Sequence, residues 1–306
     1  MDVKAPVRAM LIYNPTAGQI WSPFRPEAVQ EYLAKHDWSV DIRPTAYAGS
    51  GSELARQAVS EAYDVVIAAG GDGTLNEVTQ GLAYSSVSLG ILPVGTTNVL
   101  AREFQIPLSF QEALEYLPIA QSATIDLGKV NQRYFLLMAG IGYDAEVVRD
   151  VNLQIKTVAG KTAVVTSGLL NLFNHQPFVV RLKCVDEKGR RLRLRRTAMQ
   201  IFVSNASTYA TDYKIAEDAR MDDGLLELHI FKSKSFQDTF FSLISLAMRR
   251  HKEWTDFEHY SVTQVEISGR KAAPVQIDGD TICTLPVRIE VAPQALKVLK
   301  PKLMPG

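Results

Sequence analysis

The chain has little cysteine, no excess of charge of either sign and no long hydrophobic run. Its 306 residues include two cysteines, Cys184 and Cys283, which lack the CxxC spacing typical of metal or redox sites. The 33 basic residues balance 33 acidic ones, which argues against nucleic acid as a partner. No segment approaches the roughly 18 apolar residues that a membrane span needs, and no signal-peptide pattern precedes the first predicted strand. These absences predict a cytoplasmic protein with free thiols, whose membrane contact is peripheral.

What the first third of the chain does contain is an alternation of strand and helix patterns. Strands are predicted at 8–13, 39–42, 64–69 and 88–94, with helical patterns between them. This alternation predicts an α/β fold with a doubly wound parallel sheet that is covered by helices. Such sheets bind ligands at the carboxyl ends of their strands. Polar turns follow Tyr13, Ala69 and Val94, and the sequence therefore predicts a binding site at that edge.

Beyond residue 124 the pattern changes to hairpins. Strand-like segments joined by short polar turns predict a second domain over 125–294, a mostly antiparallel β-sandwich. The first domain is predicted to span 1–124, and a strand at about 295–302 could return to it. An exposed strand edge in the second domain could pair two chains in a homodimer.

A run of arginines stands out in the second domain. Strand alternation puts Arg191, Arg193 and Arg195 on one face. We interpret this face as solvated, in preference to a site for anionic lipid or nucleic acid.

The segment 65–78, VVIAAGGDGTLNEV, reads as a buried strand, a glycine turn and a helix. Glycines let the backbone approach an anion closely, and the N–H groups at the helix start would face it. Thr74 and Glu77 have the spacing of a capping box. Asp72 would repel phosphate unless a metal or an acceptor hydroxyl lies between them. We therefore predict that this turn binds a nucleotide.

Six blocks of the chain stand out in order: NPTAG (14–18), GGDGTLN (70–76), GTTN (95–98), GIGYDA (140–145), MDDGLL (221–226) and QIDGD (276–280). Together they resemble the diacylglycerol kinase-like lipid kinases, most closely the soluble bacterial ones, with sphingosine and ceramide kinases as more distant relatives. Gly-Gly-Asp-Gly-Thr alone also occurs in NAD kinases and phosphofructokinases, so the order of all six blocks carries the resemblance. It covers nearly the whole chain.

The resemblance implies a two-domain kinase that uses ATP and Mg²⁺ to phosphorylate a hydroxyl of a diacylglycerol-like lipid at a membrane surface. It places a structural magnesium site at Asp223 with the backbone oxygens of Arg220 and Leu225. It places the proton acceptor in the block Asp278-Gly279-Asp280. The residues implied to contact ATP are Asn14, Pro15, Thr16, Gly18, Thr45, Gly70, Gly71, Asp72, Gly73, Thr74, Leu75, Asn76, Glu77 and Thr96.

The chemistry explains why these residue types are needed. Phosphoryl transfer depends on positioning and on neutralising the charge of the γ-phosphate, and Asp72 is suited to hold a second metal ion against the phosphates. Asp280 would take the proton of the acceptor hydroxyl, while Asp278 either shares that role or orients metal-bound water. Taken alone, Asp278-Gly279 is also a common hairpin-turn dipeptide.

The chain departs from the family pattern at several positions. Val99 and Ser50 stand where the family has Asp and often His, and Asp280 replaces the usual Glu. We interpret these changes as a different substrate preference. Two other functions stay open, namely a soluble-substrate kinase of the NAD kinase type and a non-catalytic sensor of nucleotide or lipid.

Overall fold

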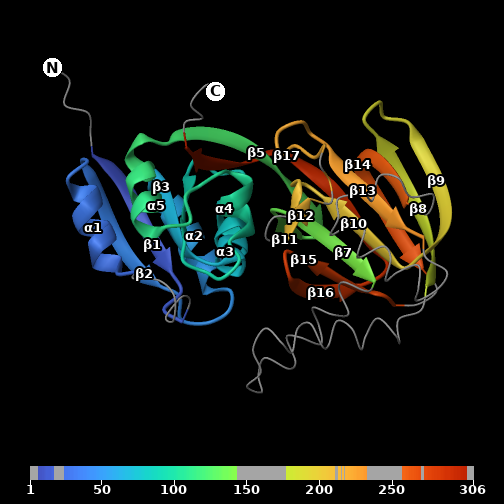
Figure 1. Ribbon diagram of the computed structural model, residues 1–306, viewed down its shortest axis with the longest axis horizontal. Helices are drawn as coiled ribbons and strands as arrows, with labels where there is room; N and C mark the ends of the chain where they lie inside the picture. The colour runs from blue at the N-terminus through green and yellow to red at the C-terminus, as the bar shows by residue number, and fades with distance from the viewer. Residues whose placement is uncertain are drawn as a thin grey trace. The chain divides into compact units, whose positions relative to one another are not determined.

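The computed structural model describes residues 6–16, 24–142, 177–210, 213–214, 216, 218–232, 257–269 and 272–301. The chain divides into two compact units (Figure 1). The first unit comprises Met1–Leu127, Ala210–Asp212 and Pro293–Gly306, and the second comprises Gly128–Tyr209 and Tyr213–Ala292. None of the described helices has both the length and the apolar character needed to cross a membrane.

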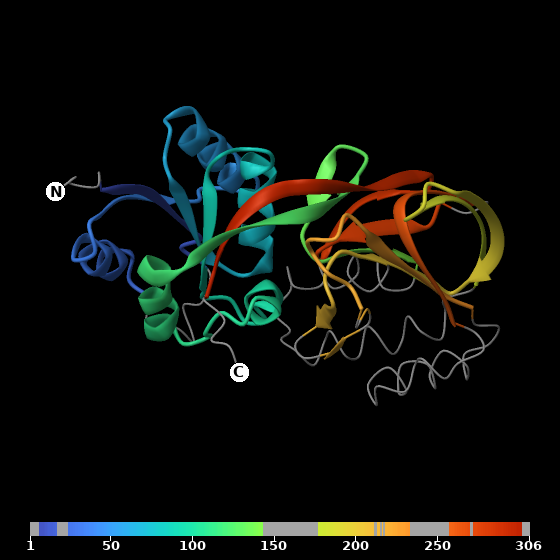
Figure 2. The ribbon, with the colours of Figure 1, turned by 90° about the horizontal axis from the view of Figure 1, so that it is seen from above.

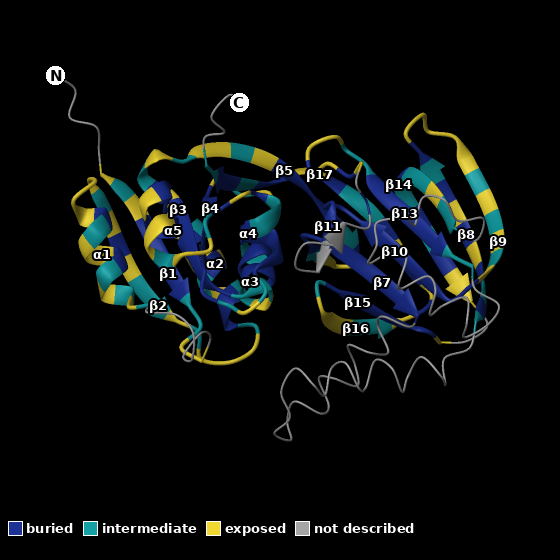
Figure 3. Cartoon of the chain, in the orientation of Figure 1, coloured by how far each residue is buried: buried dark blue, intermediate teal, exposed yellow. Residues whose placement is uncertain are grey.

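The first unit contains the predicted parallel sheet. Its strands lie in the order β4-β3-β1-β2 and are all parallel. Every residue of β3 and β4 is buried (Figure 3), as expected for strands covered on both faces. The bounds are β1 Val7–Tyr13, β2 Trp38–Pro44, β3 Val65–Gly70 and β4 Ser88–Pro93.

Helices cover both faces of this sheet (Figure 2). Helices α2 and α3 pack closely on one side, where a Cβ added to Gly81 would lie 2.5 Å from the Cβ of Ala55. Helix α1 buries Val29 and Leu33 against the sheet. The bounds are α1 Pro26–Ala34, α2 Ser50–Ser60, α3 Asp72–Leu82, α4 Val99–Glu103 and α5 Phe110–Tyr116, followed by a 3-10 turn at Leu117–Ile119.

The second unit is the predicted antiparallel β-sandwich. Its main sheet runs in the order β16-β15-β7-β10-β13-β14-β17, and β14 also pairs with β8, which pairs with β9. The strands are β7 Met138–Gly142, β8 Phe178–Asp186, β9 Arg191–Ala198, β10 Gln200–Ser204, β13 Leu226–Phe231, β14 Phe257–Gly269, β15 Pro274–Ile277, β16 Asp280–Thr284 and β17 Val287–Lys300.

Three further features complete the chain path. Strand β5 (Gln121–Val130) forms a hairpin with β6 (Arg133–Phe135), and a small sheet joins β11 (Thr208–Ala210) to β12 (Tyr213–Lys214). Late in β17, Lys297 and Val298 pair in parallel with β4 of the first unit. The chain therefore ends in a strand that belongs to the first sheet.

The core of the second unit explains the state of one cysteine. Cys184 on β8 is buried among apolar residues such as Val180, Ile201 and Leu228. Burial raises the pKa of its thiol to about 11, because the thiolate would lose its hydration. Both cysteines are free, as the sequence predicts.

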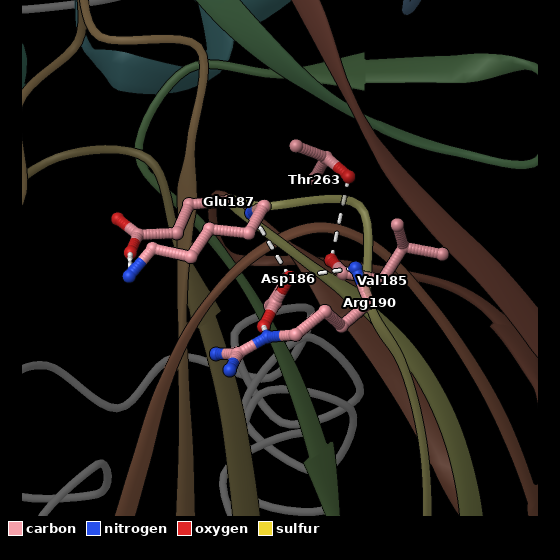
Figure 4. A network of polar contacts seen from close by, with 6 residues as sticks. Val185, Asp186, Glu187, Arg190 and Thr263 are labelled. Atoms are coloured by element: carbon pink, nitrogen blue, oxygen red, sulfur yellow. Dashed lines mark hydrogen bonds and ion pairs between the residues drawn. The ribbon is translucent and has the colours of Figure 1, made fainter.

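The turn of the β8–β9 hairpin is built around one carboxylate (Figure 4). Asp186 accepts hydrogen bonds from the backbone N–H groups of Lys188 (2.9 Å) and Arg190 (2.8 Å) and from the Arg190 Nε atom (2.7 Å). Burial raises the pKa of Asp186, but these hydrogen bonds outweigh it, and the pKa lies below its ordinary value. Beside the turn, the Thr263 hydroxyl donates to the Val185 carbonyl at 3.3 Å. The register of the hairpin is thereby set.

Candidate active site

The turns that follow β1, β2, β3 and β4 lie side by side at one edge of the first sheet. The N–H of Asn14 donates to the Ala69 carbonyl (3.2 Å), and the N–H of Thr45 donates to the Tyr13 carbonyl (2.8 Å). The N–H of Val94 donates to the Gly70 carbonyl at 3.3 Å. The structure thus brings together the predicted segments around Asn14, Thr45, Gly70 and Gly95.

The turn after β1 is organised by the Asn14 side chain. Its Oδ1 atom accepts hydrogen bonds from the backbone N–H of Thr16 (2.9 Å) and from the Thr16 hydroxyl (2.8 Å). An Asn that bonds the backbone two residues on forms an Asx turn. Pro15 and Thr16 are exposed in this turn, and Gly18 lies outside the described residues.

The glycine turn after β3 packs against the turn after β4. A Cβ added to Gly95 would lie 2.4 Å from the Cα of Gly71 and 3.0 Å from its nitrogen. Asn98 holds its turn closed, because its Nδ2 atom donates to the Gly95 carbonyl (2.8 Å) and its Oδ1 accepts from the Gly95 N–H (3.1 Å). The two backbones therefore touch where no side chain fits, and Thr96 is exposed beside them.

This close approach leads to a first prediction. Replacing Gly95 with Ala should lower the free energy of unfolding by about 1–3 kcal/mol, because the methyl group would meet backbone atoms that cannot move aside. Gly73→Ala is the matched control, since a Cβ there meets no atom within 4 Å. Thermal unfolding of both variants measures the difference. Equal melting temperatures for the two would contradict this account of the contact.

Asp72 begins helix α3 and faces the start of α4. Its Oδ1 atom accepts the N–H of Leu100 at 3.3 Å. Burial raises the pKa of Asp72, against the lowering effect of hydrogen bonds from the N–H groups of Val99 and Leu100. The Val99 side chain, which stands where the family has Asp, is itself buried. The role of Asp72 as a metal ligand stays a prediction.

The capping box predicted for Thr74 and Glu77 is wrong. Helix α3 already begins at Asp72, and no side chain caps its start. Glu77 reaches instead to the start of α2, where its Oε1 accepts the N–H of Gly49 (2.8 Å) and its Oε2 accepts that of Gly51 (3.1 Å). These N–H groups belong to the start of another helix, where they have no partner within that helix, and a carboxylate is the acceptor that such a helix start favours.

A second prediction follows for Glu77. Replacing it with Ala should lower the free energy of unfolding by about 2–4 kcal/mol, because two N–H groups at the start of α2 lose a charged acceptor. Glu77→Gln keeps one acceptor oxygen and should lower the free energy of unfolding by less than Glu77→Ala does. Chemical denaturation of the two variants measures the losses. An Ala variant as stable as the unchanged chain would show that water replaces the carboxylate at no cost.

The sequence singled out Ser50 and Asn98 as positions but did not predict their structural role. Ser50, at the first position of α2, accepts the N–H of Ala46 (3.1 Å) and donates to the Tyr47 carbonyl (2.7 Å), and so closes the loop after Thr45. Asn98 closes the turn after β4 as described above. The available signal was the same at both positions, a polar side chain three or four residues from the start of a turn.

In the second unit, the predicted acidic block forms the turn between β15 and β16. Asp278 has a positive φ of 46°, and its carboxylate accepts the backbone N–H groups of Leu136 (2.7 Å), Leu137 (2.9 Å) and Met138 (3.0 Å). The N–H of Gly279 donates to the Gln276 side chain at 2.8 Å. Asp280 is exposed at the start of β16.

The contacts of Asp278 define its place in the turn. One carboxylate ties three successive backbone N–H groups, before and at the start of β7, to the β15–β16 turn. Asp278 therefore has the geometry of a residue that positions the turn. Asp280 follows it two residues later, at the exposed end of the turn.

The predicted magnesium ligands lie in one turn before β13. The Asp223 carboxylate accepts the N–H of Leu225 at 3.0 Å, and the Arg220 Nε atom lies 3.2 Å from Oδ1 of Asp222. Within the described residues no group of three or more His, Cys, Asp or Glu side chains is placed to hold a metal ion. A cation here would depend on Asp223 together with carbonyl oxygens of the turn, and such hard oxygen donors suit Mg²⁺.

A cavity of about 570 Å³ opens beside the Gly95 turn. Residues of helices α1 and α5 contribute to its lining, which includes Arg25, Lys35 and Phe110, and Gly95 and Asn98 line it as well. Its volume falls within the range of small-molecule sites. The cavity therefore leaves room for part of a ligand that contacts this turn.

The comparisons agree with this architecture. Residues 8–130 match the diacylglycerol kinase catalytic domain, and residues 138–300 match the YegS C-terminal NAD kinase beta sandwich-like domain. A diacylglycerol kinase from Bacillus subtilis (strain 168) is 29% identical over 300 residues, which cover 96% of this chain and 97% of the relative. One from Staphylococcus aureus (strain JH9) is 29% identical over 283 residues, which cover 89% and 86%.

Solved structures show the same fold. A structure from Bacillus anthracis str. Sterne superimposes with a TM-score of 0.78 at 24% identity, covering 96% of this chain and 97% of that one. Another, described as a diacylglycerol kinase from the same strain, has a TM-score of 0.72 at 21% identity and covers 96% of both chains.

Fold and domain matches together define a lipid kinase with a parallel-sheet catalytic domain and a β-sandwich domain. The chain belongs to the diacylglycerol kinase-like lipid kinase family, as the six blocks of its sequence predict.

Proposed function

We propose that this lipid kinase transfers the γ-phosphate of ATP to a hydroxyl of a diacylglycerol-like lipid and requires Mg²⁺. The observation that supports ATP most strongly is the close contact of Gly71 with Gly95, which requires that the N-cap position of α3 carry no side chain. Relatives named diacylglycerol kinase over nearly the whole length of the chain support the acceptor. The acceptor lies in a membrane, so the enzyme contacts the inner membrane surface peripherally.

In this proposal the first unit holds the nucleotide. The backbone N–H groups from Gly71 to Thr74 point fixed dipoles at the phosphates and need no reorganisation during the reaction. Asn14 and Thr16 line the adjacent turn and would contact the nucleotide from the end of β1. Thr45, Leu75, Asn76, Glu77 and Thr96 remain the further contacts that the family resemblance implies.

The second unit supplies the proton acceptor. The acceptor hydroxyl oxygen forms a bond to the γ-phosphorus while the bond from that phosphorus to the β-phosphate oxygen breaks, and the hydroxyl proton passes to the Asp280 carboxylate. Asp278 positions Asp280 by holding the turn on β7. Asp72 would hold the catalytic Mg²⁺ ion, which would neutralise phosphate charge when bound. Asp223, with the carbonyls of Arg220 and Leu225, would hold a separate, structural ion.

The test is incubation of the purified chain with γ-labelled ATP, Mg²⁺ and a panel of lipids in mixed micelles. We expect label in one class of lipid with a free hydroxyl, and no label when Mg²⁺ is chelated or Asp72 is replaced by Ala. Label in NAD, with no need for micelles, would instead identify a soluble-substrate kinase. Tight ATP binding without transfer to any acceptor would identify a sensor.

A further inference from the structure

The outward face of the β8–β9 hairpin carries five basic side chains, which we call the basic face. Arg181 and Lys183 on β8 and the three β9 residues Arg191, Arg193 and Arg195 are all exposed. Between them, Leu182, Cys184, Leu192 and Leu194 point to the apolar core. Figure 3 shows the resulting alternation of exposed and less exposed residues along β9.

Like charges face each other directly across the two strands. Arg181 is opposite Arg195, and Lys183 is opposite Arg193. Such pairs destabilise a sheet. Lys183 is offset by Glu266, 3.0 Å away. The guanidinium groups of the four arginines form no ion pair with any residue that the structure describes. In a chain of zero net charge, positive charge is thus concentrated here.

Protection of a sheet edge does not account for this arrangement. Among the strands that the structure describes, β9 pairs with β8 alone, so its arginines could discourage pairing with another chain. Strand β8, however, lies between β14 and β9 and has no open edge. Protection of an open edge therefore does not explain Arg181 and Lys183, although both add to the repulsion between the strands. An anion bound at these side chains from outside the chain would offset their mutual repulsion.

We propose that the basic face docks on an anionic phospholipid surface. Arginine binds phosphate with a planar fork of donors, which suits lipid headgroups. Alternate residues of a strand lie about 6.5 Å apart, so neighbouring arginines can reach separate headgroups. The exposed large apolar residues of the described chain, Tyr47, Tyr84, Leu108 and Ile119, all lie in the first unit. The basic face therefore lacks aromatic rings on which single-stranded nucleic acid would stack, and its binding is electrostatic.

This proposal rests on the proposed function only in the choice of a lipid surface, and its vesicle-binding test uses neither ATP nor acceptor lipid. The full chain is sedimented with vesicles of phosphatidylcholine that contain phosphatidylglycerol and, separately, with vesicles of phosphatidylcholine alone. We expect binding to the anionic vesicles only, and its loss at high salt. Equal binding to both vesicles, or to neither, would overturn the proposal.

The decisive variant is Arg193→Glu/Arg195→Glu. Each glutamate would stand opposite Lys183 or Arg181, so the hairpin gains two favourable pairs and the melting temperature should not fall. Vesicle partitioning should drop at least about 30-fold, as expected for two lost basic contacts at an anionic surface. Transfer to a short-chain acceptor dispersed without vesicles should stay unchanged.

The matched control is Arg56→Glu/Arg133→Glu, which changes the net charge equally at exposed positions on α2 and β6. It should keep most of the vesicle binding. An equal loss in the control would show that net charge, and not the basic face, drives binding. Stronger competition by single-stranded DNA than by anionic vesicles would show a nucleic-acid surface and overturn the proposal.

Discussion

Replacing Asp280 with Asn should reduce the rate of phosphate transfer to lipid by about 10²–10⁴-fold, because the acceptor hydroxyl loses its proton acceptor. Affinity for ATP should stay the same, since in the proposed mechanism Asp280 acts on the acceptor hydroxyl and is not among the residues that hold the nucleotide. Initial rates with γ-labelled ATP measure the first effect, and equilibrium titration with ATP measures the second.

Asp280→Glu is the control for this prediction. Glutamate is the residue that stands here in the family pattern, and it keeps the carboxylate on a side chain one methylene longer. We expect the Glu variant to retain transfer, with a changed preference among lipid acceptors. An Asp280→Asn variant as active as the unchanged chain would exclude Asp280 as the proton acceptor.

Replacing Asp278 with Ala should lower the free energy of unfolding by about 3 kcal/mol or more, because three backbone N–H groups on and before β7 lose one ionised acceptor. Leu136, Leu137 and Met138 are buried, so water cannot readily replace the carboxylate. Chemical denaturation measures the loss. Asp278→Asn keeps one acceptor oxygen and should lower the free energy of unfolding by less than Asp278→Ala does.

Substitutions at the two aspartates should therefore affect different properties, activity at Asp280 and stability at Asp278. Asp280→Asn should leave the free energy of unfolding within about 0.5 kcal/mol of the unchanged chain, as expected for an exposed position. Asp278→Ala should lose stability first and activity as a consequence. A stable but inactive Asp278→Ala chain would contradict the positioning role and favour a share in proton transfer.

Local patterns predicted much of the first unit. The apolar runs of β3 and β4 and the helical spacing of Leu75, Val78 and Leu82 are short-range features, and the strands and α3 formed close to the expected places. Asp278-Gly279 was also readable as a hairpin turn, and it is one. Each of these depends on residues within a few positions of one another.

The partners of the acidic side chains were not predictable in the same way. Glu77 was expected to cap its own helix, yet it binds N–H groups 26 and 28 residues earlier in the chain. Asp278 binds N–H groups 140 to 142 residues away. Such contacts depend on which strands and helices become neighbours, and a single sequence carries no local sign of that.

The sequence by itself determined the family, the parallel sheet with its glycine turn and the hairpin pattern of the second unit, because these depend on short motifs and on periodicity. The tertiary structure alone decided two other matters: that Glu77 serves α2, and that Asp278 is held by backbone N–H groups. The reason is register: which atoms meet across strands is set by packing of distant segments, and that packing forms only in the folded chain.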